Sequence, residues 1–124
     1  MKFSEFININ SVLQKIGKQT ATFKVSYHIA KMIKAMEDDM KFYEERTQAI
    51  IDEYGLRNED GSFVMTNQNG VMIRPECFDE CAKQINELNE IEVTTVLPKI
   101  KMELLENFEM SAEEAFILQS IIEE

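Results

Sequence analysis

Apolar residues recur at alternating steps of four and three between Ser26 and Tyr54. This spacing is that of a heptad seam on one face of an α-helix, and no proline or glycine interrupts it. The pattern predicts one helix over 26–54, about 40 Å long at about 1.5 Å per residue, with Ser26 as its N-cap. Such a helix needs a packing partner, because packing rather than propensity stabilises most helices. The seam residues are Ile29, Ile33, Met36, Met40, Tyr43, Thr47, Ile50 and Tyr54.

Two further helices are predicted on either side of this one. Apolar residues at helical spacing indicate a helix over 4–17, which begins at an N-cap, Ser4, and stops at Gly17. The other covers 75–90 and begins with Pro75, since proline is common in the first turn of helices. We expect the 75–90 helix to pack antiparallel against the distal half of the long helix.

A last helix is predicted over 112–123. It follows a capping box, in which Ser111 and Glu114 each bond the other's backbone amide. Its apolar face is broad for a terminal helix. We therefore expect it to cover the core, and a partner-binding helix is the alternative.

Three other stretches have the features of short strands. Two β-prone runs over 63–73 are joined by five residues that end in Asn-Gly, which favours a β-hairpin. Apolar and polar residues alternate over 91–103, with a break at Pro98. We interpret this stretch as two short strands, although its spacing also suits a helix. Residues 21–25 are rich in β-formers and predict a brief strand or extended arm.

Together these elements predict a mostly helical α+β fold in a single domain over 1–124. A long antiparallel helical hairpin is tipped by a β-hairpin. A small sheet and two further helices lie at its base.

Charge is distributed unevenly along the chain. The net charge is −10, but residues 1–35 hold six lysines and one acid, whereas residues 36–124 have a net charge of −15. An acidic field repels nucleic acid and anionic membranes and attracts basic protein surfaces. Solvated helix faces that keep a small protein soluble are the simpler explanation. The charge favours a protein partner with a basic surface over nucleic acid, and the lysine-rich first third keeps nucleic-acid binding as a third alternative.

Residues that carry chemistry are sparse. Cys77 and Cys81 are four apart on the predicted 75–90 helix, so their Cβ atoms are about 5–6 Å apart. A disulfide needs about 3.5–4.5 Å, so we expect two reduced core residues. With the single, distant His28 they fall short of the three or four ligands of a zinc site. We interpret His28 as a residue with local hydrogen bonds.

Other functional classes lack their sequence signals. The four glycines are in predicted turns or caps, so they form no phosphate-binding loop. No apolar run approaches the roughly 18 residues of a membrane span, and the first residues lack the apolar region of a secretory signal. We therefore expect a protein that is not an enzyme and has no cofactor, metal or membrane segment.

A series of short structural motifs covers nearly the whole chain. They are Lys24-Val25-Ser26-Tyr27, Ile29-Ala30-Lys31, Asp60-Gly61, Asn69-Gly70, Ile85-Asn86-Glu87-Leu88, Glu90-Ile91-Glu92-Val93 and Pro98-Lys99-Ile100. In this order and spacing the chain resembles a family of small phage and prophage proteins of Gram-positive bacteria, known as a domain of unknown function. The resemblance implies a phage-encoded protein of the host cytoplasm. It brings no catalytic residues.

The expected function is therefore binding without catalysis. The leading hypothesis is an acidic inhibitor of a host defence protein or of a protein that acts on nucleic acid. The alternative is a virion or assembly accessory protein that self-associates or docks on another phage protein. The sequence assigns no partner-binding residue.

Overall fold

The chain divides into two compact units in the computed structural model, which describes residues 1–123. The terminal unit combines Met1–Met40 with Glu92–Glu124, of which Glu124 lies outside the described residues. The central unit is Lys41–Ile91. One long helix contributes residues to both units.

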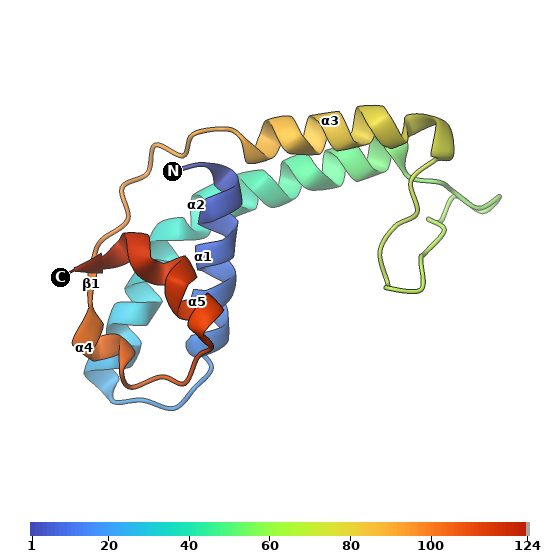
Figure 1. Ribbon diagram of the computed structural model, residues 1–124. Helices are drawn as coiled ribbons and strands as arrows, with labels where there is room; N and C mark the ends of the chain where they lie inside the picture. The colour runs from blue at the N-terminus through green and yellow to red at the C-terminus, as the bar shows by residue number, and fades with distance from the viewer. Residues whose placement is uncertain (124) are drawn as a thin grey trace. The chain divides into compact units, whose positions relative to one another are not determined.

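Helices make up most of the described chain, and a short parallel pair of strands completes it (Figure 1). The predicted mostly helical α+β class is confirmed. The elements are α1 (Phe3–Ile16), α2 (Phe23–Tyr54), η1 (Pro75–Cys77), α3 (Phe78–Asn89), β1 (Ile100–Lys101), α4 (Met102–Leu105), α5 (Ala112–Ile117), η2 (Leu118–Ile121) and β2 (Ile122–Glu123).

Helix α1 supplies a third of the core of the terminal unit. Its buried residues are Phe3, Phe6, Ile9, Val12, Leu13 and Ile16. Gly17 is the C-cap, as predicted, but Lys2 takes the N-cap position without a side-chain hydrogen bond. The prediction that Ser4 caps this helix is wrong. Burial of Phe3 in the first turn is worth about 1.5–3 kcal/mol, which outweighs a serine cap of about 1 kcal/mol.

Helix α2 begins earlier than the sequence pattern indicates. The predicted strand or arm over 21–25 is wrong, because the helix starts at Phe23. The amide of Ser26 donates to the carbonyl of Thr22 over 3.0 Å, so Ser26 lies inside the helix and is not its N-cap. Val25 explains the extension: it is buried and continues the apolar stripe one turn before Ile29.

The seam of α2 faces the interior of each unit. All eight predicted seam residues are buried or half-buried, and Val25 and Met32 join them as buried residues. The charged side chains of the helix are exposed apart from Asp39, which is half-buried. The Asp39 carboxylate accepts a 2.6 Å hydrogen bond from the Thr95 hydroxyl.

The predicted strands over 91–103 shrink to a single short one. Only Ile100–Lys101 is a strand, and it pairs in parallel with Ile122–Glu123. Residues 93–99 follow an irregular path, in which Val93 and Leu97 are buried and Val96 is 90% exposed. A four-residue step between buried side chains does not fit the period of two in a strand. Helix α4 begins at Met102, directly after β1.

The predicted helix over 112–123 is divided into three parts. The Ser111–Glu114 capping box is present as predicted, but the α-helix ends at Ile117 and continues as the 3₁₀-helix η2 and strand β2. Residues three apart share one face of a 3₁₀-helix. This tighter turn therefore buries Leu118 and Ile121 together. The pairing of β2 with β1 then requires an extended backbone.

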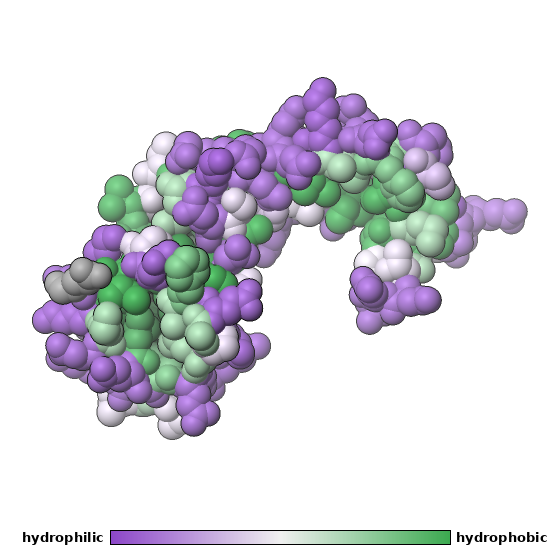
Figure 2. All heavy atoms as spheres, in the orientation of Figure 1, coloured by the Kyte–Doolittle hydropathy of each residue, from purple (hydrophilic) through white to green (hydrophobic). Residues whose placement is uncertain are grey.

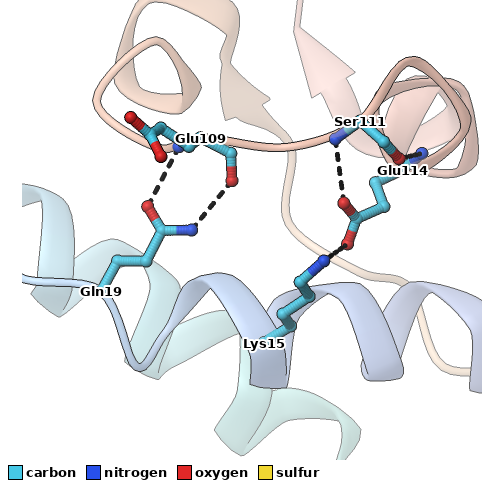
Figure 3. Close-up of polar contacts among 5 residues, drawn as sticks. All are labelled: Lys15, Gln19, Glu109, Ser111 and Glu114. Carbon is cyan, nitrogen blue, oxygen red and sulfur yellow. Dashed lines mark hydrogen bonds and ion pairs between the residues drawn. The ribbon is translucent and has the colours of Figure 1, made fainter.

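A group of polar contacts joins the end of α1 and the residues after it to α5 and the segment before α5 (Figure 3). The Gln19 side chain donates to the carbonyl of Glu109 over 2.8 Å and accepts from its amide over 3.0 Å. Lys15 Nζ lies 2.9 Å from a Glu114 carboxylate oxygen, and the other oxygen accepts from the Ser111 amide over 2.9 Å. These donors hold the pKa of Glu114 below its ordinary range, the Ser111 amide most of all.

The central unit consists mainly of residues 41–54 of α2 and of α3, which lie side by side (Figure 1). Two hydrogen bonds of 2.6 Å join them, from the Tyr43 hydroxyl to Asn89 and from Gln84 to the Tyr54 hydroxyl. The predicted 75–90 helix begins as a 3₁₀ turn, because η1 precedes α3. The buried cluster consists of Ile50, Tyr54, Cys81 and Leu88.

Three short segments pair in the turn between these helices. The Leu56 amide donates to Met72, that of Met72 to Val64, and that of Val64 to Leu56, each over 2.8 Å. The bonds form a closed ring, and the pairing consists of isolated antiparallel bridges. The hairpin predicted over 63–73 therefore has no regular strands, and the sequence interpretation omitted its third segment, around Leu56. Each pair of segments is joined by a single β-bridge, and a regular strand needs at least two consecutive bridges.

Candidate protein-contact surface

An open groove of about 450 Å³ lies between α2 and α3 on the central unit. Its apolar side chains are Phe42, Ile50, Leu88 and Ile91. Phe42 is 47% exposed and Ile91 is 44% exposed. In Figure 2 the apolar side chains of this unit gather mainly at the end of the two helices beside the turn, and polar side chains cover most of the visible length of α3.

The geometry of two paired helices explains this exposure. Two helices bury only the positions that face each other, and residues at the edge of the stripe stay open to solvent. Phe42 precedes the seam residue Tyr43 by one position, and Ile91 follows the buried Leu88 by three. Both side chains therefore lie at the edge of the interface and line the groove.

The groove carries charges of both signs. Arg46 and Lys83 supply two positive charges, and Glu80 and Glu87 supply two negative charges. Within the described chain, Arg46, Lys83 and Glu87 form no intramolecular ion pair. These three charged groups are available to a partner.

The outer face of α3 is more acidic. A second, shallow depression there has a volume of about 630 Å³. Asp79, Glu87 and Glu90 line it with one base, Lys83. The depression borders the groove, and Lys83, Glu87 and Ile91 line both. The central unit as a whole has eleven acids and five bases, a net charge of −6. This face can attract a basic surface.

The two cysteines lie in and beside the central cluster. Both are free thiols, with Cys81 buried in the central cluster and Cys77 half-buried. Burial raises the pKa of the Cys81 thiol, and the neighbouring Cys77 adds to this. A thiol whose pKa is raised is protonated at neutral pH and is a poor nucleophile.

The start of α2 carries a second exposed feature, which the sequence interpretation missed. The rings of Phe23 and Tyr27 are stacked with centroids 6.0 Å apart, and Lys31 Nζ lies 5.6 Å from the Tyr27 ring centroid. Phe23 is 84% exposed. His28 is exposed and packs edge-on against Tyr27. The four-residue spacing of the two aromatic residues was the available signal, but residues 21–25 were interpreted as a strand.

Among residues 1–123, no group of three or more His, Cys, Asp or Glu side chains is placed to hold a metal ion. None of the helices in this range combines the length and apolar character needed to cross a membrane.

Comparison with protein-family models, with curated proteins and with solved structures found no match to this chain. The candidate surface therefore rests on the geometry of the central unit alone.

Proposed function

We propose that this protein is a non-enzymatic binding protein, encoded by a phage and active in the host cytoplasm, that contacts a basic surface of a host or phage protein. The acidic outer face of α3 is the observation that supports this proposal. Three acids surround a shallow depression there with one base among them. Charge of one sign on an exposed face raises the rate of encounter with the opposite sign and selects against like-charged partners.

The proposed architecture of the contact element is an antiparallel helical hairpin. The hydrogen bond from Tyr43, early in the central part of α2, reaches Asn89 at the end of α3. The bond to Tyr54, at the end of α2, comes from Gln84. The three-segment turn would form the tip of this hairpin. Such an element presents the length of α3 to a partner.

Inhibition is the leading form of this function. Proteins that bind nucleic acid use basic surfaces to contact phosphates. An acidic helix can occupy such a surface and compete with the nucleic acid. The partner would then be a host defence protein or another protein that acts on nucleic acid.

Affinity capture at increasing salt tests this proposal. Tagged protein is incubated with host lysate, and the wild type is compared with D79K/E90K on the outer face of α3. E103K/E106K is the control, because it makes the same charge change at exposed residues of the terminal unit. We expect capture by the wild type and the control that weakens as salt rises. Capture that is independent of salt, or equal capture by D79K/E90K, would contradict the proposal.

The second candidate is a virion or assembly accessory protein. The half-exposed Phe42 and Ile91 favour it, because paired apolar side chains at the edge of a helix interface are typical of contact between proteins. Mass spectrometry of purified virions and assembly intermediates tests it. Absence of the protein from both would exclude this candidate.

A further inference from the structure

We propose that the groove between α2 and α3 is a homodimer interface, in which it binds the same groove of a second copy of this chain. The inference rests on the second candidate function, an accessory protein that self-associates, and it names the surface through which two copies bind. It does not depend on the acidic outer face of α3 binding a basic protein.

The first argument is incomplete burial. Two paired helices form one layer, and a stable helical fold needs a second layer against it. Only Ile50, Tyr54, Cys81 and Leu88 are buried in the central cluster. Phe42 and Ile91 each leave more than two fifths of their surface in water, although both line the groove. A second copy would supply the missing layer and make a four-helix arrangement.

The second argument concerns which protein the groove binds, and it rests on the charges that line the groove. Arg46 and Lys83 balance Glu80 and Glu87 in the groove. A basic protein would leave the two bases without partners, and an acidic protein would leave the two acids without partners. A two-fold interface brings one surface against itself, so a surface with both signs can pair with its own copy. The copy is therefore the partner whose charge matches.

The expected interface is small. The groove is one flank of two short helical segments, so we place it at the lower end of the range for specific interfaces, about 1,200 Å² of total buried surface. An interface of this size gives a dimer that dissociates on dilution.

Sedimentation velocity over a range of protein concentrations provides the first test. We expect the wild type to pass from monomer to dimer as concentration rises. I91E places a charge in the groove and should raise the dimer dissociation constant about tenfold or more. V96E is the matched control, because Val96 is a more exposed apolar residue of the terminal unit. A wild type that stays monomeric throughout, or equal effects of I91E and V96E, would overturn the proposal.

A charge exchange provides the second test and needs no assumption about which residues pair. R46E/K83E makes all four charged groove positions acidic, and E80K/E87R makes all four basic. Each variant should fail to self-associate, and an equimolar mixture should form a heterodimer. The proposal would be overturned if the mixture contained no more dimer than either variant alone, provided that both variants have the circular dichroism spectrum of the wild type.

The same variants separate this inference from the proposed function. R46E/K83E keeps Asp79, Glu87 and Glu90 on the outer face of α3 and replaces the one base there, Lys83, by an acid, so this face becomes more acidic. It should therefore still capture a basic partner while it no longer self-associates. If R46E/K83E neither self-associates nor captures a basic partner, the result would contradict the proposed function and leave the dimer standing. If R46E/K83E still self-associates, the result would contradict the dimer, whatever it captures.

Discussion

The two units differ sharply in how much of their apolar surface they bury. Of the twenty-one buried apolar side chains among residues 1–123, the terminal unit contains seventeen and the central unit contains four. The first unit is built from several elements that cover one another. The second relies on one pair of helices, a ring of three backbone hydrogen bonds, one hydrogen bond donated by the Tyr43 hydroxyl and one accepted by the Tyr54 hydroxyl. The difference predicts that the terminal unit is the more stable of the two, and it supports the contact role that we propose for the central unit.

Truncation of core residues should show this difference most strongly. Phe6 is fully buried in the terminal unit, and Phe6→Ala should lower the free energy of unfolding by about 3–5 kcal/mol. Leu88 lies at the edge of a thinner cluster, so Leu88→Ala should cost only about 2 kcal/mol. Urea unfolding at low protein concentration measures both. An equal or larger cost for Leu88→Ala would contradict the comparison.

The tyrosine bonds of the central unit should have the next largest effect. Tyr54→Phe removes the bond from Gln84 and should cost about 1 kcal/mol. Burial raises the pKa of Tyr54, and Glu53 adds to this. A raised pKa means that Tyr54 contributes stability that is complete below its unfolded pKa, about 10, and is lost as pH rises through the folded pKa. Tyr54→Phe should therefore flatten the loss of stability above about pH 10. An unchanged alkaline profile would exclude this role.

Loss of the capping box should destabilise the terminal unit by a similar amount. Ser111→Ala removes the side-chain acceptor for the Glu114 amide and should cost about 1 kcal/mol. Thermal unfolding followed by circular dichroism measures this. Ser120→Ala is the control, because the side chain of Ser120 is exposed and only its carbonyl accepts a bond, from Lys99. Equal changes in both variants would argue against the cap.

Glu114 should add a dependence on acid pH. Its pKa is lowered, first by the Ser111 amide and then by Lys15. The carboxylate therefore contributes stability that is present above its unfolded pKa and is lost as pH falls through the lower folded pKa. Glu114→Gln should reduce the slope of stability against pH in this acidic range. The neighbouring exposed Glu113→Gln is the matched control, and the same slope for all three proteins would refute the assignment.

The aromatic pair at the start of α2 should have the smallest effect. Phe23 is almost fully exposed, so Phe23→Ala should change the free energy of unfolding by no more than about 0.5 kcal/mol. The net charge of −10 predicts a flat gel-shift titration with single-stranded DNA at low salt, for wild type and variant alike. A shift that Phe23→Ala abolishes would make this pair a stacking platform for nucleic acid.

Sequence reasoning was most successful where one local signal decided the structure. The seam of α2 needed only its own spacing, and the Ser111–Glu114 box needed only four residues. It failed where a contact with a segment far away in the sequence determined the local structure. Val25 extends α2 because the core of the terminal unit buries it, and β2 is extended because it pairs with β1. A period of two or four in a short stretch cannot reveal such partners.

The groove could not be predicted from the sequence for the same reason, because it forms only when two helices pack together. Its charged residues come from α2 and α3, and their balance is visible only when the two helices are paired. Phe42 lies at an edge because it is beside the seam residue Tyr43, and the exposure of Ile91 depends on where α3 ends. The acidic character of the chain after residue 35 was clear from the sequence, whereas its concentration on the outer face of α3 was not.

Hydrogen–deuterium exchange of the wild type at low and high protein concentration tests the central claim most directly. If contact with a second copy completes the central unit, amides of α3 and of residues 41–54 should exchange quickly at low concentration and gain protection at high concentration. Those of α1 should be well protected at both concentrations. Equal protection of the two units, unchanged by concentration, would contradict the account.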